Sequence, residues 1–152
     1  MTGIPYNPKQ SENSGFNQTP GATLLGVKAK TTGDLIRVIK TGLPTGSVRG
    51  LAAALGLTQE RTLQLVDIPA RTFSRRATEQ GLLDPSQSER TARLARVTEK
   101  AHAVMGQEGG NRWLQHHWPA FDGQSALDYA GTDLGAETVI DVIHALEDGI
   151  FV

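Results

Sequence analysis

The sequence contains no cysteine, and this absence excludes disulfide bonds and thiolate metal sites. It also has no apolar run near the roughly 18 residues that a membrane-spanning helix needs. The first twenty residues lack the basic-then-apolar pattern of a secretory signal peptide, so we expect none. With these absences, a chain of 152 residues is expected to form one domain or two small ones in a reducing cytoplasm.

Positive charge is nearly missing from the last third of the chain. Residues 108–152 carry eight acidic side chains and a single basic one, Arg112, for a net charge of −7. Residues 1–44 and 45–107 each carry a net charge of +3, and the whole chain therefore has a net charge of −1. This division predicts two surfaces with different partners.

Hydrophobic spacing predicts helices and no strands. No segment shows sustained alternation of apolar and polar residues, whereas apolar residues recur at i, i+3 and i+4 in several segments, so we expect an all-α fold. Helices are expected from Asp34, from Ser47 and Thr58 as N-caps, and from Pro69 to about Gln80; over 85–106, where Gly106 ends the helix; in NRWLQHHWPAF before Pro119; in DGQSALDYAG; and in TDLGAETVIDVIHALEDG.

Composition divides the chain into three parts. Residues 1–20 are rich in Asn, Gln, Ser, Pro and Gly, and the apolar patch ATLLGVKAK that follows is too short to assign, so we expect a flexible N-terminal arm over 1–33. Residues 34–106 are expected to form a helical domain with a long connecting helix. Residues 107–152 are expected to form a small acidic helical domain, and QEGGN (107–111) is the expected joint.

One short segment crowds three arginines and two hydroxyl residues around Phe73, at positions 71–76. On a helix over residues 69–80, one narrow stripe is apolar and can dock on a core: Ala70, Phe73 and Ala77. The opposite face is cationic or hydroxylic: Arg71, Thr72, Arg75 and Thr78, flanked by Ser74 and Arg76.

This pattern is typical of a DNA recognition helix. The guanidinium fork of arginine matches guanine O6 and N7 in the major groove, and hydroxyl groups donate to phosphates or base edges. The helix expected over 58–66 and a short turn precede the segment, which predicts a helix-turn-helix. An alternative is that residues 58–66 are the reader, although their charges are balanced. The preferred DNA-binding residues are Arg71, Thr72, Ser74, Arg75 and Arg76.

We expect no cofactor, no metal site and no enzymatic activity. His116 and His117 are neighbours on an expected helix, where they point about 100° apart and cannot easily bind one ion together. The sequence has no glycine-rich phosphate loop, nucleophile elbow or carboxylate pair. Trp113 and Phe121 are expected to be largely core residues.

The segments LTQERTLQLVDIPARTFSRR, SQSERTARLARVTEKAHAVMG and RWLQHHWPAFDGQSALDYAGTDLGAETVIDVIHALEDGIF follow one another in this chain. This order resembles the Xre/MbcA/ParS-like antitoxin family, and most of all the antitoxins that are paired with RES-domain toxins. The resemblance covers about residues 34–152. It implies a helix-turn-helix that represses its own operon and a C-terminal domain that binds the toxin. RES toxins are understood to degrade NAD⁺, and the antitoxin's C-terminal end is thought to cover their active-site entrance.

With this resemblance, we assign the toxin-binding residues to the acidic domain: Trp113, Asp122, Tyr129, Glu147, Asp148, Gly149, Ile150 and Phe151. The acids at 147 and 148 end a helix, where the dipole disfavours negative charge, so a cationic partner would relieve that cost. The expected partners are the cognate RES-domain toxin and operator DNA, with a homodimer inside a larger complex and no membrane. The alternative is a stand-alone repressor whose acidic domain serves dimerisation or a ligand.

Overall fold

The computed structural model describes residues 19–149, and within them it contains helices and no strand. In that range, β-type pairing between backbone segments is limited to two isolated bridges, Pro44 with Leu82 and His117 with Ser125. The helices are α2 (Ala22–Leu25), α3 (Thr32–Thr41), α4 (Gly46–Leu55), α5 (Gln59–Leu65), α6 (Ala70–Glu79), α7 (Pro85–Gln115), the 3-10 turn η1 (Pro119–Phe121), α8 (Ala126–Tyr129) and α9 (Asp133–Glu147). The predicted all-α fold is confirmed.

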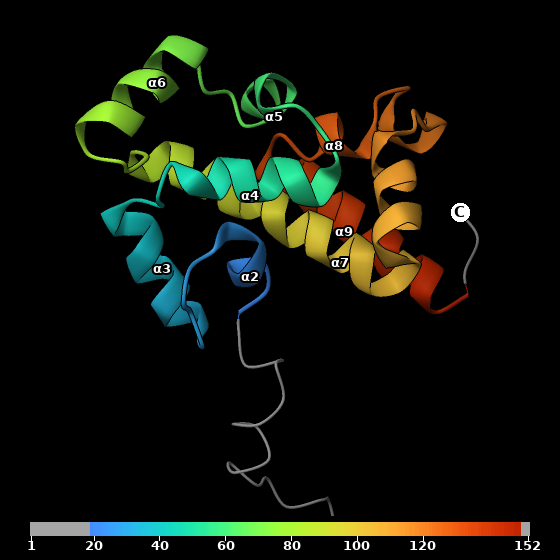
Figure 1. Ribbon diagram of the computed structural model, residues 1–152. Helices are drawn as coiled ribbons and strands as arrows, with labels where there is room; N and C mark the ends of the chain where they lie inside the picture. The colour runs from blue at the N-terminus through green and yellow to red at the C-terminus, as the bar shows by residue number, and fades with distance from the viewer. Residues whose placement is uncertain (1–18, 150–152) are drawn as a thin grey trace, which may run out of the picture.

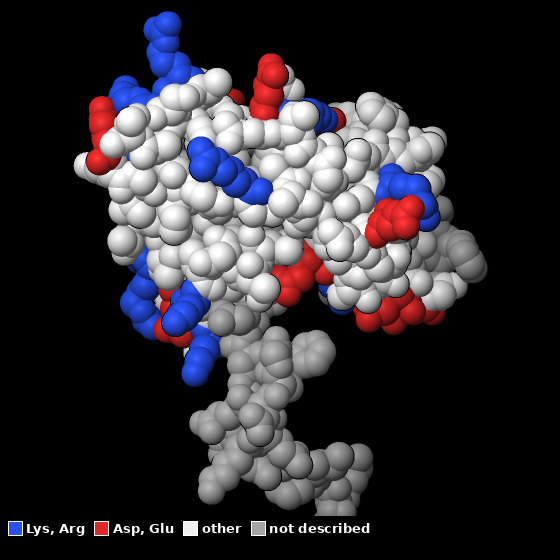
Figure 2. Space-filling model, in the orientation of Figure 1, with Lys and Arg blue, Asp and Glu red and all other residues white. Residues whose placement is uncertain are grey.

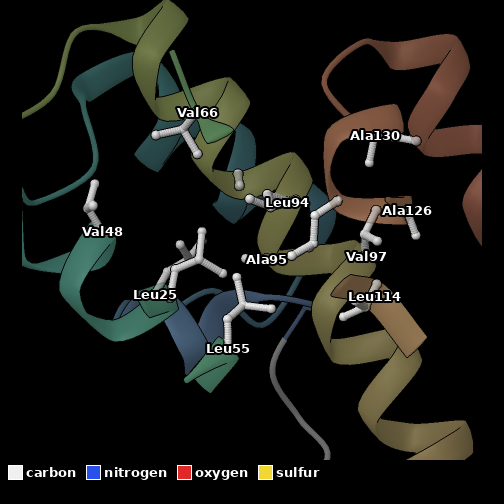
Figure 3. Packing of buried hydrophobic residues seen from close by; sticks show 14 of the residues in the cluster. Leu25, Val48, Leu55, Val66, Leu94, Ala95, Val97, Leu114, Ala126 and Ala130 are labelled. Carbon is white, nitrogen blue, oxygen red and sulfur yellow. The ribbon is translucent and has the colours of Figure 1, made fainter. Parts of the chain in front are cut away.

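The long helix α7 is the centre of the fold, because α2, α3, α4, α8 and α9 all pack against it (Figure 1). A single apolar cluster runs from α2 to α9 and includes Leu25, Leu55, Leu94, Leu114 and Ala126 (Figure 3). The N-terminal and C-terminal parts of the chain therefore share one core.

Local sequence signals set several helix ends as predicted. Thr58 caps α5 by accepting a hydrogen bond from the backbone N–H of Arg61, and Gly56 ends α4 with a φ of 67°.

The predicted N-cap of α4, Ser47, is wrong. Helix α4 begins after Thr45, and Ser47 lies inside it, where its buried hydroxyl donates to the carbonyl oxygen of Leu25 at 2.6 Å. Ser47 thus ties α4 to α2 instead of capping α4.

The predicted flexible arm is wrong for residues 19–33. Ala22, Leu25 and Ala29 in this stretch are at most 2% exposed, and α2 packs on α4 and α7. Gly50 on α4 permits this approach, because a Cβ there would collide with the carbonyl oxygen of Leu24. The apolar patch is buried because α4 and α7 offer it a shared surface. The arm predicted for residues 1–18 lies outside the described residues.

Helix α7 consists of two arms separated by Gly106. Asp84 and Gln87 form a capping box at its start, with Pro85 at the first helical position. Gly106 interrupts the helix as predicted, with φ 77° and ψ 167°, a backbone conformation that is nearly restricted to glycine. Helix then resumes directly after Gly106, so residues 107–111, where the joint is expected, are helical.

Close packing between the two arms explains one glycine of that segment, Gly110. Gly110 is buried, and a Cβ there would lie 3.0 Å from the carbonyl oxygen of Ala101. Asn111, next in the chain, donates through its amide to the carbonyl oxygen of Ala54 at 2.9 Å. The second arm ends at Gln115 and not at Pro119 as predicted, because Pro119 starts the separate turn η1.

Candidate functional site

Helices α5 and α6 form a helix-turn-helix with a tight turn between them. Asp67 takes a left-handed φ of 54°, and the N–H of Ile68 bonds back to the carbonyl oxygen of Leu63 at 2.9 Å. Buried Val66 and Ile68 fasten the turn to the core. The turn between the two helices of the preferred pair is thus fixed to the core.

Arg90, on the first arm of α7, holds this turn in place. Its Nε donates to the carbonyl oxygen of Val66 at 2.7 Å, and its Nη2 donates to that of Asp67 at 3.0 Å. Its Nη1 reaches the hydroxyl of Ser86 at 2.8 Å. Arg90 was not among the site residues expected from the sequence, although it lies in the segment SQSERTARLARVTEKAHAVMG, which carries part of the family resemblance.

Helix α6 presents its polar face to solvent. Arg71, Ser74 and Arg75 are exposed and Thr72 is half-buried, whereas Phe73 is 2% exposed. Basic side chains project from the edge of the molecule where Figure 1 places α6 (Figure 2). All five predicted DNA-binding residues therefore lie on α6, and three of them, Arg71, Ser74 and Arg75, are exposed.

The predicted apolar stripe of α6 is narrower than expected. Ala70 and Ala77 are exposed, so Phe73 alone of the three stripe residues is buried. Arg76, the fifth predicted DNA-binding residue, points toward α7. Its side chain is 28% exposed and its Nη2 lies 3.7 Å from the carboxylate of Asp84, the residue that caps α7. This placement favours a structural role for Arg76.

The alternative reader, α5, has little free positive charge. Its only arginine, Arg61, donates through Nη2 to both carboxylate oxygens of Asp128, at 3.0 and 3.2 Å. Thr62 is fully buried and bonds to the carbonyl oxygen of Thr58, and Glu60 is exposed. The geometry therefore favours α6 over α5 as the DNA-facing helix.

Further contacts join the helix-turn-helix part to the acidic part. Arg93 on α7 lies 2.8 Å from the carboxylate of Asp133, as an ion pair without hydrogen-bond geometry at Nε, and its Nη1 donates to the carbonyl oxygen of Gly131 at 3.2 Å. Gln115 donates to the carbonyl oxygen of Leu55 at 3.2 Å. These contacts hold α8 and α9 against the first part of the chain.

Aromatic rings build the corner after α7. Trp113 meets Phe121 edge-to-face with 5.8 Å between ring centroids, and it lies 6.2 Å from the ring of Trp118. The indole N–H of Trp118 donates to the carbonyl oxygen of Trp113 at 3.0 Å. Phe121 is a core residue as predicted, at 1% exposure, whereas Trp113 is only half-buried.

The exposed side of this corner forms a surface hollow of about 720 Å³, which we call the apolar groove. It lies where the break of α7, η1 and the last turns of α9 meet. Its lining is apolar throughout: Val104, Met105, Trp113, Trp118, Pro119, Ala120, Phe121, Val142 and Leu146. Sequence reasoning missed it, because helical spacing identifies Val142 and Leu146 as core residues without showing that one side stays open.

Two other predicted toxin-binding residues, Asp122 and Tyr129, do not line the apolar groove with Trp113. Tyr129 lies in a separate hollow of about 280 Å³, together with Asp128 and Leu134. Leu134, which the sequence reasoning also missed, is 78% exposed. Asp122 is exposed and takes a left-handed φ of 55° after η1.

The end of α9 carries the last described residues. Glu147 pairs with Lys100 of α7, with 3.0 Å between Nζ and the carboxylate, so part of the helix-end cost expected for this acid is already relieved within the chain. Asp148 and Gly149 are exposed, and Gly149 has a φ of 78°. The predicted contacts Ile150 and Phe151 lie outside the described residues. No helix within 19–149 is both long and apolar enough to cross a membrane.

Comparisons with known proteins match two successive parts of the chain to two family models. Residues 34–96 match the family model of the antitoxin Xre-like helix-turn-helix domain. Residues 100–149 match that of the antitoxin Xre/MbcA/ParS C-terminal toxin-binding domain. A relative from Yersinia enterocolitica (serotype O:8 / biotype 1B), Antitoxin Xre, is 29% identical over 129 residues, which cover 84% of this chain and 87% of the relative.

Proposed function

Since this chain belongs to the Xre/MbcA/ParS antitoxin family, we propose that it neutralises a RES-domain toxin and represses its own operon. Membership of the family gives the general function: the chain is an antitoxin with a helix-turn-helix DNA-binding domain and a toxin-binding domain. That identity indicates a regulator. The kind of toxin comes from the resemblance of the sequence to antitoxins that are paired with RES-domain toxins, which are understood to degrade NAD⁺.

One observation carries the proposal: the two parts of the chain carry net charge of opposite sign, +3 over residues 45–107 and −7 over residues 108–149. Helix α6 exposes Arg71 and Arg75, which suit DNA, whereas residues 108–149 carry eight acids and one base. An enzyme that binds the pyrophosphate of NAD⁺ needs a cationic pocket. An acidic module is attracted to such a pocket and can cover it.

For the operator, Arg71 and Arg75 are the base-reading residues of the proposal. Both are exposed on α6, and Phe73 between them is buried, so the helix is anchored while its arginines are free to reach a major groove. One recognition helix reads a half-site, and helix-turn-helix proteins read two half-sites as symmetric pairs. The repressing species is therefore a homodimer within the toxin–antitoxin complex.

For the toxin, residues 147–152 are the segment that covers the active-site mouth. Asp148 is exposed at the end of α9 and is the acid that faces a substrate-binding arginine of the toxin, because Glu147 is already paired with Lys100. The apolar residues Ile150, Phe151 and Val152 follow it in the sequence, where they suit a hydrophobic pocket rim.

The test is co-expression with the product of the neighbouring reading frame. The wild-type chain should protect cells and prevent loss of NAD⁺, and a chain that ends at Leu146 should still bind operator DNA but fail to protect. Equal protection by the shortened chain at equal expression would remove the covering role from the C-terminal segment. If the neighbouring product is harmless alone, a stand-alone repressor is the better description.

A further inference from the structure

The apolar groove is larger than the fold itself requires. Leu114, Val139 and Ile143, on the same helices as several lining residues, are fully buried and already belong to a closed core. The nine lining residues enclose about 720 Å³ of open space, which is within the range of protein ligand sites. A contiguous apolar hollow of this kind marks an interaction site more often than scattered apolar residues do.

The shape of the groove depends on the break in α7. Val104 and Met105 line it from the first arm, directly before Gly106, and Trp113 lines it from the second arm. Gly110 lets the two arms approach, because a Cβ there would press on the carbonyl oxygen of Ala101 at 3.0 Å. The sequence therefore uses two glycines in a helical segment, at a cost in helix stability, and the resulting turn holds the groove open.

Two observations indicate what occupies the groove. All its lining residues fall between 104 and 146, inside the stretch that matches the toxin-binding domain. The same stretch, 100–149, carries eight acids and only two bases, Lys100 and Arg112. Both bases are paired, Lys100 with Glu147 and Arg112 with Glu108. Asp122 directly follows the lining residue Phe121, and Asp148 lies two residues after the lining residue Leu146; both acids are exposed, so acidic side chains beside the groove attract positive charge.

We propose that the apolar groove is the anchor point of the toxin and takes an apolar segment of it that is flanked by basic residues. The inference rests on the proposed function only in that the partner is the toxin. It separates two tasks: the groove holds the complex together, and residues 147–152 block the toxin's active site. Leu146 lines the groove one residue before the blocking segment begins, so one toxin surface can meet both.

The first test places a charge in the groove. Ala120 is exposed and lines it, so Ala120→Arg should fold normally and fill the groove with a cation. Affinity for the purified product of the neighbouring reading frame should fall about 30-fold or more, the loss typical of an interface hot spot. Ala53→Arg is the matched control, because Ala53 is exposed on α4 and does not line the groove. Both variants should keep wild-type operator affinity.

The second test uses the tryptophans, because the chain has two and both line the groove. In the antitoxin labelled with 5-fluorotryptophan, both ¹⁹F resonances should shift when the toxin is added. A chain without residues 150–152 should bind the toxin with nearly wild-type affinity and shift both resonances, while it no longer blocks toxin activity.

Four results would overturn the inference. Unchanged toxin affinity of Ala120→Arg would show that the anchor lies elsewhere, with the proposed function intact. Conversion of a dimer to a monomer by Ala120→Arg, with toxin binding retained, would assign the groove to a second copy of the chain. If, without toxin, the ¹⁹F resonances of the chain that lacks residues 150–152 differ from those of the full chain, the groove would be assigned to the chain's own C-terminal end. If the wild-type chain does not bind the neighbouring product, the proposed function fails, and the inference fails with it.

Discussion

The guanidinium group of Arg61 on α5 lies within 3.2 Å of both carboxylate oxygens of Asp128 on α8. This pair, in which a single nitrogen, Nη2, donates to both oxygens, joins the helix-turn-helix to the toxin-binding domain. Both side chains are about 40% exposed, so solvent screens the pair. A double-mutant cycle with Arg61→Ala and Asp128→Ala, measured by urea unfolding, should give a coupling free energy below about 1 kcal/mol. A coupling of several kcal/mol would mean that the pair behaves as a buried one.

Arg71 and Arg75 provide the prediction for DNA. Each bidentate arginine–guanine contact is worth about 1–3 kcal/mol, so the double variant Arg71→Ala/Arg75→Ala should lose operator binding in a gel-shift assay. Toxin binding should not change. Arg112→Ala, which removes an exposed arginine from the opposite part of the chain, should bind operator DNA normally. Retained binding by the double variant would favour α5 as the reader.

Arg90 gives a prediction that concerns the turn. Its guanidinium satisfies the carbonyl oxygens of Val66 and Asp67, and a lysine cannot replace the planar fork. Arg90→Lys should lower the free energy of unfolding by about 1–3 kcal/mol and weaken operator binding as α6 loses its fixed orientation. Arg96→Lys, at an exposed position on the same helix, should change neither by more than about 0.5 kcal/mol. Equal effects of both variants would contradict the role of Arg90.

Two adjacent glycines offer opposite outcomes for one substitution. A Cβ at Gly109 would meet nothing closer than the Cβ of Met105 at 3.8 Å, so Gly109→Ala should stabilise the helix by up to about 1 kcal/mol. At Gly110 the Cβ would lie 3.0 Å from the carbonyl oxygen of Ala101, so Gly110→Ala should lower the melting temperature. Thermal unfolding followed by circular dichroism distinguishes the two. Stabilisation by both substitutions would show that the arms of α7 are not held together tightly.

Local chemistry explains which parts of the fold the sequence could predict. The cap at Thr58 and the left-handed stop at Gly56 act within one helical turn, so neighbouring residues suffice to recognise them. Helix α2 has four residues, too few to show a helical period, and its burial depends on α4 and α7, which are distant in the sequence. The role of Gly110 could not be predicted for a related reason: the glycine is required by a contact with Ala101, nine residues earlier, and not by a turn.

In the candidate site too, features that depend on neighbouring residues could be predicted, and features that depend on contacts between distant residues could not. The accessible face of α6 could be predicted because one helix determines it. Arg76 could not be separated from Arg75, because its partner Asp84 is reached only after the chain turns back. The apolar groove could not be predicted at all, because it needs α7, η1 and α9 in their places at once.

The continuous core from α2 to α9 has a consequence for how such a protein is removed from the cell. Helices that share one core unfold together, so a protease that engages either end has no independently stable half to leave behind. A single degradation event would then release the toxin and vacate the operator at the same moment. Transcription would resume just when new antitoxin is needed, and the timing would follow from packing alone, without a separate sensor.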